Sequence, residues 1–130
     1  MGAIIHQAVV VTACDPWAKT AHTKAVRLCG KDHVTELGPA LTNGFRSFLV
    51  IPDGSKEGWI ESDVGAEHRE AFVNWLNRQR YGDGSSPYDW VLVEYGERYV
   101  GKGAVVLDHT GRRKPSDRWK GPADLRLGRT

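Results

Sequence analysis

The sequence has little cysteine and no long hydrophobic run, which excludes two structural devices. Its two cysteines, Cys14 and Cys29, fall at opposite ends of the first predicted helix. About 14 residues at about 1.5 Å each place them roughly 20 Å apart, whereas a disulfide needs Cα atoms within about 7 Å. No apolar run approaches the roughly 18 residues that a membrane span needs, and residues 1–6 do not resemble a secretion signal. We therefore expect a soluble, cytoplasmic protein with two free thiols and no membrane partner.

Motifs for catalysis and metal binding are also missing. The sequence has no phosphate-binding loop of the form GxxxxGK[ST], no dinucleotide fingerprint and no Gly-x-Ser-x-Gly. None of the five histidines has metal-ligand spacing to another histidine or to a cysteine. An enzymatic role would rest on Cys14 and His68. Cys14 lies beside a predicted helix N-terminus, which lowers the pKa of a thiol. If His68 has no catalytic role, its position predicts a hydrogen-bonded residue at the edge of the core. We expect a binding protein rather than an enzyme, with no cofactor and no metal.

Charge is distributed unevenly along the chain. The formal net charge is +2, from 18 bases and 16 acids. From His109 onward seven bases oppose two acids, a net +5, so the preceding part carries 11 bases and 14 acids, a net −3. We predict a single domain over residues 1–108 and a basic, flexible tail over residues 109–130.

Hydrophobic periodicity predicts strands that alternate with two amphipathic helices. The first helix has a side-chain cap at Asp15, a proline at its first position and a terminating glycine at Gly30, and Ser62 or Asp63 would cap the second. The apolar stripe of the second helix comprises Val64, His68, Ala71, Phe72, Trp75 and Leu76. The predicted elements are a central strand at Ile4–Ala13, a helix from Pro16 to Gly30, strands at Val34–Thr42 and Phe45–Ile51, a helix from Ser62 or Asp63 to about Tyr81, and strands at Tyr88–Tyr95 and Ala104–Leu107.

The dipeptide Asn43-Gly44 organises this order of elements. A type I′ hairpin turn needs φ > 0 at both central residues, and Asn-Gly is the pair it favours. The flanking segments should therefore pair antiparallel, and the first should lie at a sheet edge because Pro39 has no amide proton for an interior ladder. The order β-α-β-β-α-β with an extra C-terminal strand resembles the ferredoxin-like split βαβ arrangement. That α+β fold places both helices on one face of an antiparallel sheet and leaves the other face open.

Aromatic and apolar residues predict a binding surface on the open sheet face. Arg46, Phe48 and Val50 would share this face with Trp90 and Leu92, and an exposed apolar sheet face usually marks an interface. Self-association into a homodimer is the leading expectation, with the loop before the second helix extending the surface. The predicted binding residues are Arg46, Phe48, Lys56, Glu57, Trp59 and Trp90.

A nucleic-acid or nucleotide binder is the alternative interpretation. Gly44-Phe45 resembles part of an RNA-recognition motif, but Phe45 and Phe48 are three residues apart on a strand and point to opposite faces. The basic tail would neutralise phosphates and stack a base, and Arg46, Lys56 and two glycine-containing loops would contact a nucleotide. The tail residues of this alternative are Arg112, Arg113, Lys114, Arg118, Trp119 and Lys120.

Three short runs resemble small uncharacterised proteins encoded by bacteriophages and prophages. They are Asn43-Gly44-Phe45-Arg46-Ser47-Phe48, Gly54-Ser55-Lys56-Glu57-Gly58-Trp59, and Asp83-Gly84-Ser85-Ser86-Pro87 before Trp90. The similarity covers roughly residues 4–95, excludes the tail and implies no catalytic residue. It implies an accessory or inhibitor module that binds a host protein or a small anionic host signalling molecule and so disarms a defence.

Overall fold

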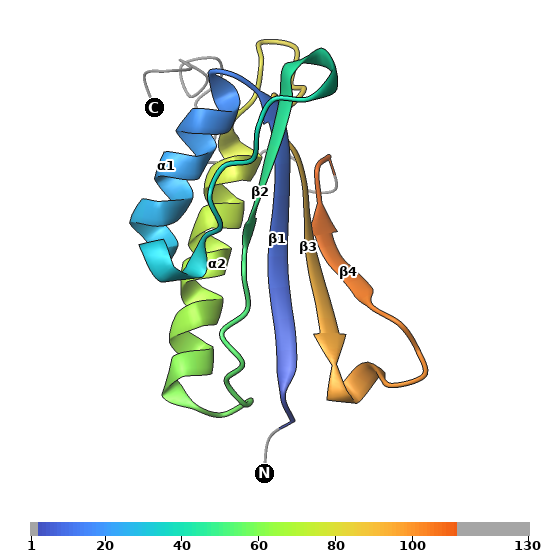
Figure 1. The fold of residues 1–130 in the computed structure, drawn as a ribbon. Helices are drawn as coiled ribbons and strands as arrows, with labels where there is room; N and C mark the ends of the chain where they lie inside the picture. The colour runs from blue at the N-terminus through green and yellow to red at the C-terminus, as the bar shows by residue number, and fades with distance from the viewer. Residues whose placement is uncertain (1–2, 112–130) are drawn as a thin grey trace.

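Two helices lie on one side of a four-stranded sheet in the computed structural model of the chain, which describes residues 3–111 (Figure 1). Neither helix of this part combines the length and the apolar character that crossing a membrane requires. The elements are β1 (Ile5–Cys14), α1 (Trp17–Cys29), β2 (Phe45–Val50), α2 (Ile60–Arg78), β3 (Asp89–Gly96) and β4 (Val105–His109), with 3₁₀ turns at Lys31–His33, Thr42–Gly44 and Glu97–Tyr99. The predicted tail residues Arg112, Arg113, Lys114, Arg118, Trp119 and Lys120 lie outside the described residues.

The sheet has the order β2-β1-β3-β4, and every neighbouring pair is antiparallel. Segment 34–41 lies along the outer edge of β2, where the Thr35 N–H donates to the Leu49 carbonyl and the Gly38 N–H to the Ser47 carbonyl, both at 2.9 Å. This segment therefore runs parallel to β1 with β2 between them, just as β2 and β3 are parallel with β1 between them. Each βαβ unit is split by a strand of the other unit, which makes the fold ferredoxin-like. β4 adds a strand at the far edge.

The hairpin turn has the predicted geometry. Asn43 and Gly44 both have positive φ, 59° and 74°, and the Leu41 N–H donates to the carbonyl of Phe45 across the turn at 3.3 Å. The segment before the turn is irregular, however, because a Gly-Pro pair at its centre removes a ladder donor. Its position at the sheet edge is confirmed, and the regular strand predicted at Val34–Thr42 is wrong.

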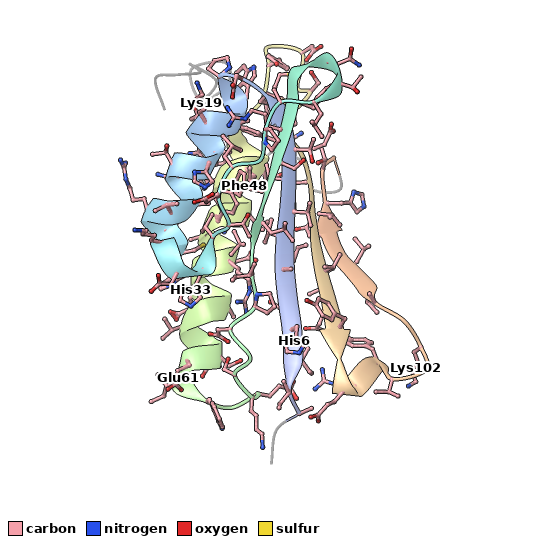
Figure 2. The ribbon with its side chains drawn as sticks, viewed as in Figure 1. His6, Lys19, His33, Phe48, Glu61 and Lys102 are labelled. Atoms are coloured by element: carbon pink, nitrogen blue, oxygen red, sulfur yellow. The ribbon has the colours of Figure 1, made fainter. Side chains whose placement is uncertain are left out.

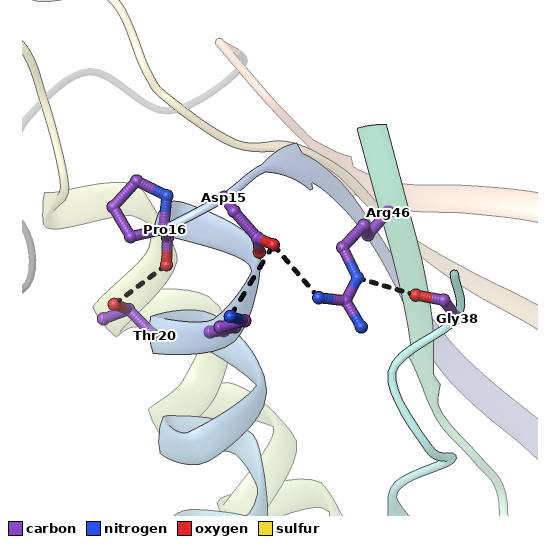
Figure 3. Close-up of polar contacts among 6 residues, drawn as sticks. Asp15, Pro16, Thr20, Gly38 and Arg46 are labelled. Atoms are coloured by element: carbon purple, nitrogen blue, oxygen red, sulfur yellow. Dashed lines mark hydrogen bonds and ion pairs between the residues drawn. The ribbon is translucent and has the colours of Figure 1, made fainter. Parts of the chain in front are cut away.

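The start of α1 differs from the prediction, whereas its end agrees. Asp15 makes no cap hydrogen bond, and α1 begins after Pro16. The Asp15 carboxylate instead pairs with Arg46 at 3.0 Å, and Arg46 Nε donates to the Gly38 carbonyl at 2.8 Å (Figure 3). Gly30, at φ 94°, closes α1 as predicted. The predicted cap is wrong because the carboxylate is engaged with β2.

The second helix begins earlier than predicted and is buried over only part of its length. α2 starts at Ile60 without a side-chain cap, so the predicted cap at Ser62 or Asp63 is wrong. Its first turns extend beyond the end of α1 (Figure 1), and there the predicted stripe residues Val64 and His68 are exposed. The stripe is confirmed at Phe72, Trp75 and Leu76 but is wrong at Ala71, which is exposed. The buried residues of α2 are Phe72, Val73, Trp75, Leu76 and Asn77.

The core lies between the helices and one face of the sheet. The strand registers set Phe48 of β2 and Trp90 of β3 opposite the same residue of β1, Val11. Phe48 is 1% exposed and Trp90 5% exposed, and Figure 2 shows Phe48 among the side chains between sheet and helices. Their shared face was predicted correctly, but its assignment as the open face is wrong. Alternation along a strand shows which residues share a face and does not show which face the helices cover.

Candidate functional site

The sheet face opposite the helices carries apolar side chains that neither helix covers (Figure 1). Val10 of β1 is the direct cross-strand neighbour of both Leu49 and Val91, and Val93 pairs with Val106. Leu49 is 38% exposed and Val106 54% exposed. Contiguous exposed apolar surface of this kind marks interaction sites. We call this patch the uncovered face; it consists of Val10, Leu49, Val91, Val93, Tyr95 and Val106.

The surroundings of the uncovered face are mostly uncharged. The alternation of β1 adds Ala8 and Thr12 to the same face, and Thr12 Oγ1 lies 2.8 Å from Ser47 Oγ in a hydrogen bond. At one end the ring of His6 lies 5.3 Å from that of Tyr95. A low charge at the centre of a surface is typical of the core of a protein interface.

A second candidate region, the Arg69 cluster, lies at the end of the molecule where α2 begins. It consists of Gln7, Asp53, Arg69, Glu94 and Tyr99. Gln7 and Glu94 are paired across β1 and β3 on the helix-covered side. Arg69 Nε donates to Gln7 Oε1 at 3.2 Å, and Gln7 Nε2 donates to Glu94 Oε1 at 2.8 Å. The Tyr99 hydroxyl donates to the other oxygen of Glu94. Gln7 is thus held in one orientation by a donor and an acceptor.

Arg69 is half-buried, and within residues 3–111 its terminal nitrogens have neither a hydrogen bond nor an ion pair. Burial lowers the pKa of its guanidinium, against the opposing influence of Asp53, Cys29 and Glu94. Asp53 Oδ1 is already engaged, because it accepts from the amide of Ser55 at 2.9 Å and from its hydroxyl at 2.7 Å. The guanidinium has lost part of its hydration without gaining a full set of acceptors.

The two carboxylates beside Arg69 are held in their charged forms. Burial raises the pKa of Glu94, but the hydrogen bonds from Tyr99 and Gln7 outweigh burial and leave that pKa below its usual value. Burial likewise raises the pKa of Asp53, and the hydrogen bonds from Ser55 together with Arg69 bring it below its usual value. Asp53 and Glu94 therefore stay ionised at neutral pH.

Two cavities meet at Arg69. The first cavity, of about 190 Å³, has the buried residues Cys29 and Val50 among its walls, and Val64 and Gly65 of α2 also line it. The second cavity, of about 230 Å³, is more polar and is lined by other members of the Arg69 cluster and by the loop before α2. Arg69 lines both cavities, so its side chain is accessible from two sides.

The structure separates the predicted binding residues. Phe48 and Trp90 are core residues, so their predicted place on an exposed binding surface is wrong. Arg46 lies at the opposite end of β2 from the Arg69 cluster and is engaged by Asp15 and Gly38. These three side chains do not form one surface.

The predicted loop residues, by contrast, come together beside the start of α2. Glu57 lines the second cavity and pairs with Arg98 at 2.5 Å. Lys56 forms an isolated bridge with Ile4, and Trp59, directly before α2, is 50% exposed. Glu57 therefore lines the same cavity as Arg69, and the role of Lys56, Glu57 and Trp59 in binding stays a prediction.

The two glycine-containing loops use their own side chains as turn acceptors. Asp83 Oδ1 accepts from the amide and hydroxyl of Ser85 at 2.9 and 2.6 Å, the same arrangement as in Asp53 and Ser55. In each loop the serine amide is occupied by the aspartate. The geometry is that of an ordinary aspartate turn.

The thiols and histidines singled out in the sequence are dispersed. Both cysteines are free; burial raises the pKa of Cys29 to about 11, and Cys14 Sγ donates to the Asn43 carbonyl at 3.7 Å. His68 is exposed, rather than at the edge of the core. Over residues 3–111, no three His, Cys, Asp or Glu side chains are grouped as a metal site would require.

The Arg69 cluster was not predicted, although the sequence carries a signal for it. Arg69 precedes Phe72 and Val73 by three and four residues, so it falls on the buried side of α2. Gln7 and Glu94 occupy inward-facing positions of two strands whose other inward residues are apolar. Polar residues at three inward positions predict a polar cluster at one end of the core.

No protein-family model, curated protein or solved structure matches the chain significantly.

Proposed function

We propose that this protein acts by binding, as a homodimer whose two copies meet through the uncovered face. The supporting observation is the row of exposed and half-buried apolar side chains across four strands, from Leu49 of β2 to Val106 of β4. Removing apolar surface from water contributes about 25 cal/mol per Å². A second sheet packed about 10 Å away would cover these side chains on both copies at once.

The low charge of the uncovered face favours a second copy as its occupant. A two-fold interface brings the same patch of both subunits together, so a charged residue at its centre would face the same charge on the other subunit and be repelled by it. Val10, Leu49 and Val93 at the centre carry no charge. A strongly charged partner would find no opposite charge there.

The oligomeric state of the full chain in solution tests this proposal. Sedimentation equilibrium over a hundredfold range of concentration should show a dimer, and Leu49→Lys and Val106→Lys should each shift it to the monomer. Ile60→Lys and Val100→Lys are matched controls, because these residues are 77% and 79% exposed and lie outside the uncovered face. The controls should leave the dimer intact.

Two results would overturn the homodimer. A chain that stays monomeric at every concentration would show that the uncovered face does not bind a second copy. A dimer that survives both lysine variants would show that the two copies meet through another surface. Action on a host protein or host signalling molecule, a phage origin and a cytoplasmic location stay predictions. Nucleic-acid binding through the basic tail also stays a prediction, since those residues lie outside the described part of the chain.

A further inference from the structure

The first cavity has an apolar part, and the polar residues that line the rest of it are His33, Asp53, Glu61, His68 and Arg69. Cys29 and Val50 are buried at its walls, and Val64 adds an aliphatic side chain from α2. A cavity of about 150 Å³ lined by apolar side chains holds a benzene ring, and this one measures about 190 Å³. It has room for a ring or a short branched chain with one small polar group.

The Nη1 end of Arg69 faces this cavity. A Cβ built on Gly65 would lie 3.2 Å from Arg69 Nη1 and 3.7 Å from Asp53 Oδ2. Gly65 and Asp53 line the first cavity and are not among the residues that line the second. Nε meanwhile points to Gln7, which lines the second. The hydrogen bond to Gln7 thus orients the guanidinium so that Nη1 is presented to the first cavity.

We propose that the first cavity binds a small monocarboxylate with an apolar body, whose carboxylate is held by the terminal nitrogens of Arg69. Guanidinium and carboxylate match in geometry, with two parallel hydrogen bonds. Asp53 and Glu61 also line the cavity. Their negative charge disfavours a multiply charged anion such as phosphate, so a singly charged acid is the better fit.

Gly65 provides a test that separates binding from folding. Alanine in the interior of a helix is more favourable than glycine, so Gly65→Ala should not weaken α2. Its methyl group would nevertheless crowd Arg69 Nη1, at 3.2 Å. The expected result is an unchanged or higher thermal midpoint together with weaker carboxylate binding, a combination that a folding defect cannot produce.

The experiment is an NMR titration of the full chain with benzoate, following the backbone amides of Val50, Gly65 and Arg69. We expect saturable shifts of these amides, and affinity at least tenfold lower for the neutral analogue benzamide and for inorganic phosphate. Arg69→Met should lower benzoate affinity at least tenfold. Arg27→Met, on the exposed side of α1, is the matched control and should leave it unchanged.

Several outcomes would overturn the assignment. They are no saturable shift with benzoate, equal affinity for benzoate and benzamide, and unchanged benzoate binding in both the Arg69→Met and Gly65→Ala variants. Preferential binding of phosphate would also contradict it, because the carboxylates on the cavity wall would then not exclude a multiply charged anion. None of these results bears on the uncovered face, which is tested separately by oligomeric state.

Discussion

Asp15 and Arg46 form an ion pair, 3.0 Å from Oδ2 to Nη1, that joins the turn before α1 to β2 (Figure 3). The same guanidinium donates from Nε to the carbonyl of Gly38 at 2.8 Å. One side chain therefore holds together the helix start, an interior strand and the irregular edge segment. Arg46 therefore has a structural role, and its hydrogen bonds to Asp15 and Gly38 leave it less available to bind a ligand.

Replacing Arg46 by methionine should lower the free energy of unfolding by about 1–2 kcal/mol. The change removes a partly buried ion pair and one hydrogen bond to a backbone carbonyl. Urea denaturation measures the difference. Lys19→Met is the control, because Lys19 is exposed and reaches Asp15 only at 4.0 Å; its effect should stay within about 0.5 kcal/mol. Equal effects of the two substitutions would contradict the structural role of Arg46.

Tyr88→Phe should raise the free energy of unfolding by about 1 kcal/mol. Tyr88 is fully buried between Trp17 and Trp75, and within the described chain its hydroxyl has no hydrogen-bond partner. Burying an unpaired hydroxyl is costly, so removing it relieves that cost while the ring contacts remain. Tyr81→Phe, at an exposed ring, should change nothing. A destabilised Tyr88→Phe protein would show that the hydroxyl has a partner.

Stability should fall at alkaline pH through Cys29. Burial raises its pKa from 9.0 to about 11, so the unfolded chain loses the proton first. This contribution to stability is complete below pH 9 and is lost as pH rises from 9 to 11. It amounts to about 1–2 kcal/mol after allowance for solvent screening. Cys29→Ala should show a flatter pH dependence of unfolding over this range; parallel curves for the two proteins would contradict the prediction.

Gly96→Ala should be far more damaging than Gly44→Ala. Gly96 has φ 130°, and a Cβ there would lie 2.7 Å from the backbone oxygen of Ile4. Gly44 has φ 74° with nothing within 4 Å of the added atom. Alanine there should therefore lower the free energy of unfolding only through the strain of its left-handed backbone, by about 1 kcal/mol. We expect about 3 kcal/mol or more at Gly96. Denaturant midpoints of the two variants give the comparison, and similar losses would mean that β1 shifts to admit the methyl group.

Local backbone chemistry made much of the fold predictable. Asn43-Gly44 specified the turn because few other dipeptides accept positive φ twice, and Gly30 ended α1 for the same reason. The covered face was not predictable from period-two alternation, because Phe48 and Leu49 belong to opposite faces that are both largely apolar. Choosing between them needs the direction in which the helices cross over the sheet.

The Arg69 cluster escaped the sequence analysis for a different reason. Arg69, Gln7 and Glu94 lie in three elements far apart in the chain, and no short motif joins them. Each alone reads as an ordinary polar residue near the end of an element. Only the pairing of β1 with β3 and the placement of α2 bring them together, and the cavities beside Arg69 follow from that placement.

Segment 34–41 protects one edge of the sheet against fibre growth. Pro39 lacks an amide donor, and the pairing of this segment with β2 consists of an isolated bridge at Val34 and scattered backbone hydrogen bonds rather than a regular ladder. At the other edge β4 has 5 residues, and its pairing with β3 is interrupted by a register shift between Leu92 and Val93. Short, irregular edges are poor templates for an incoming strand. Neither edge therefore offers a long, regular ladder through which further copies of the chain could add by strand pairing.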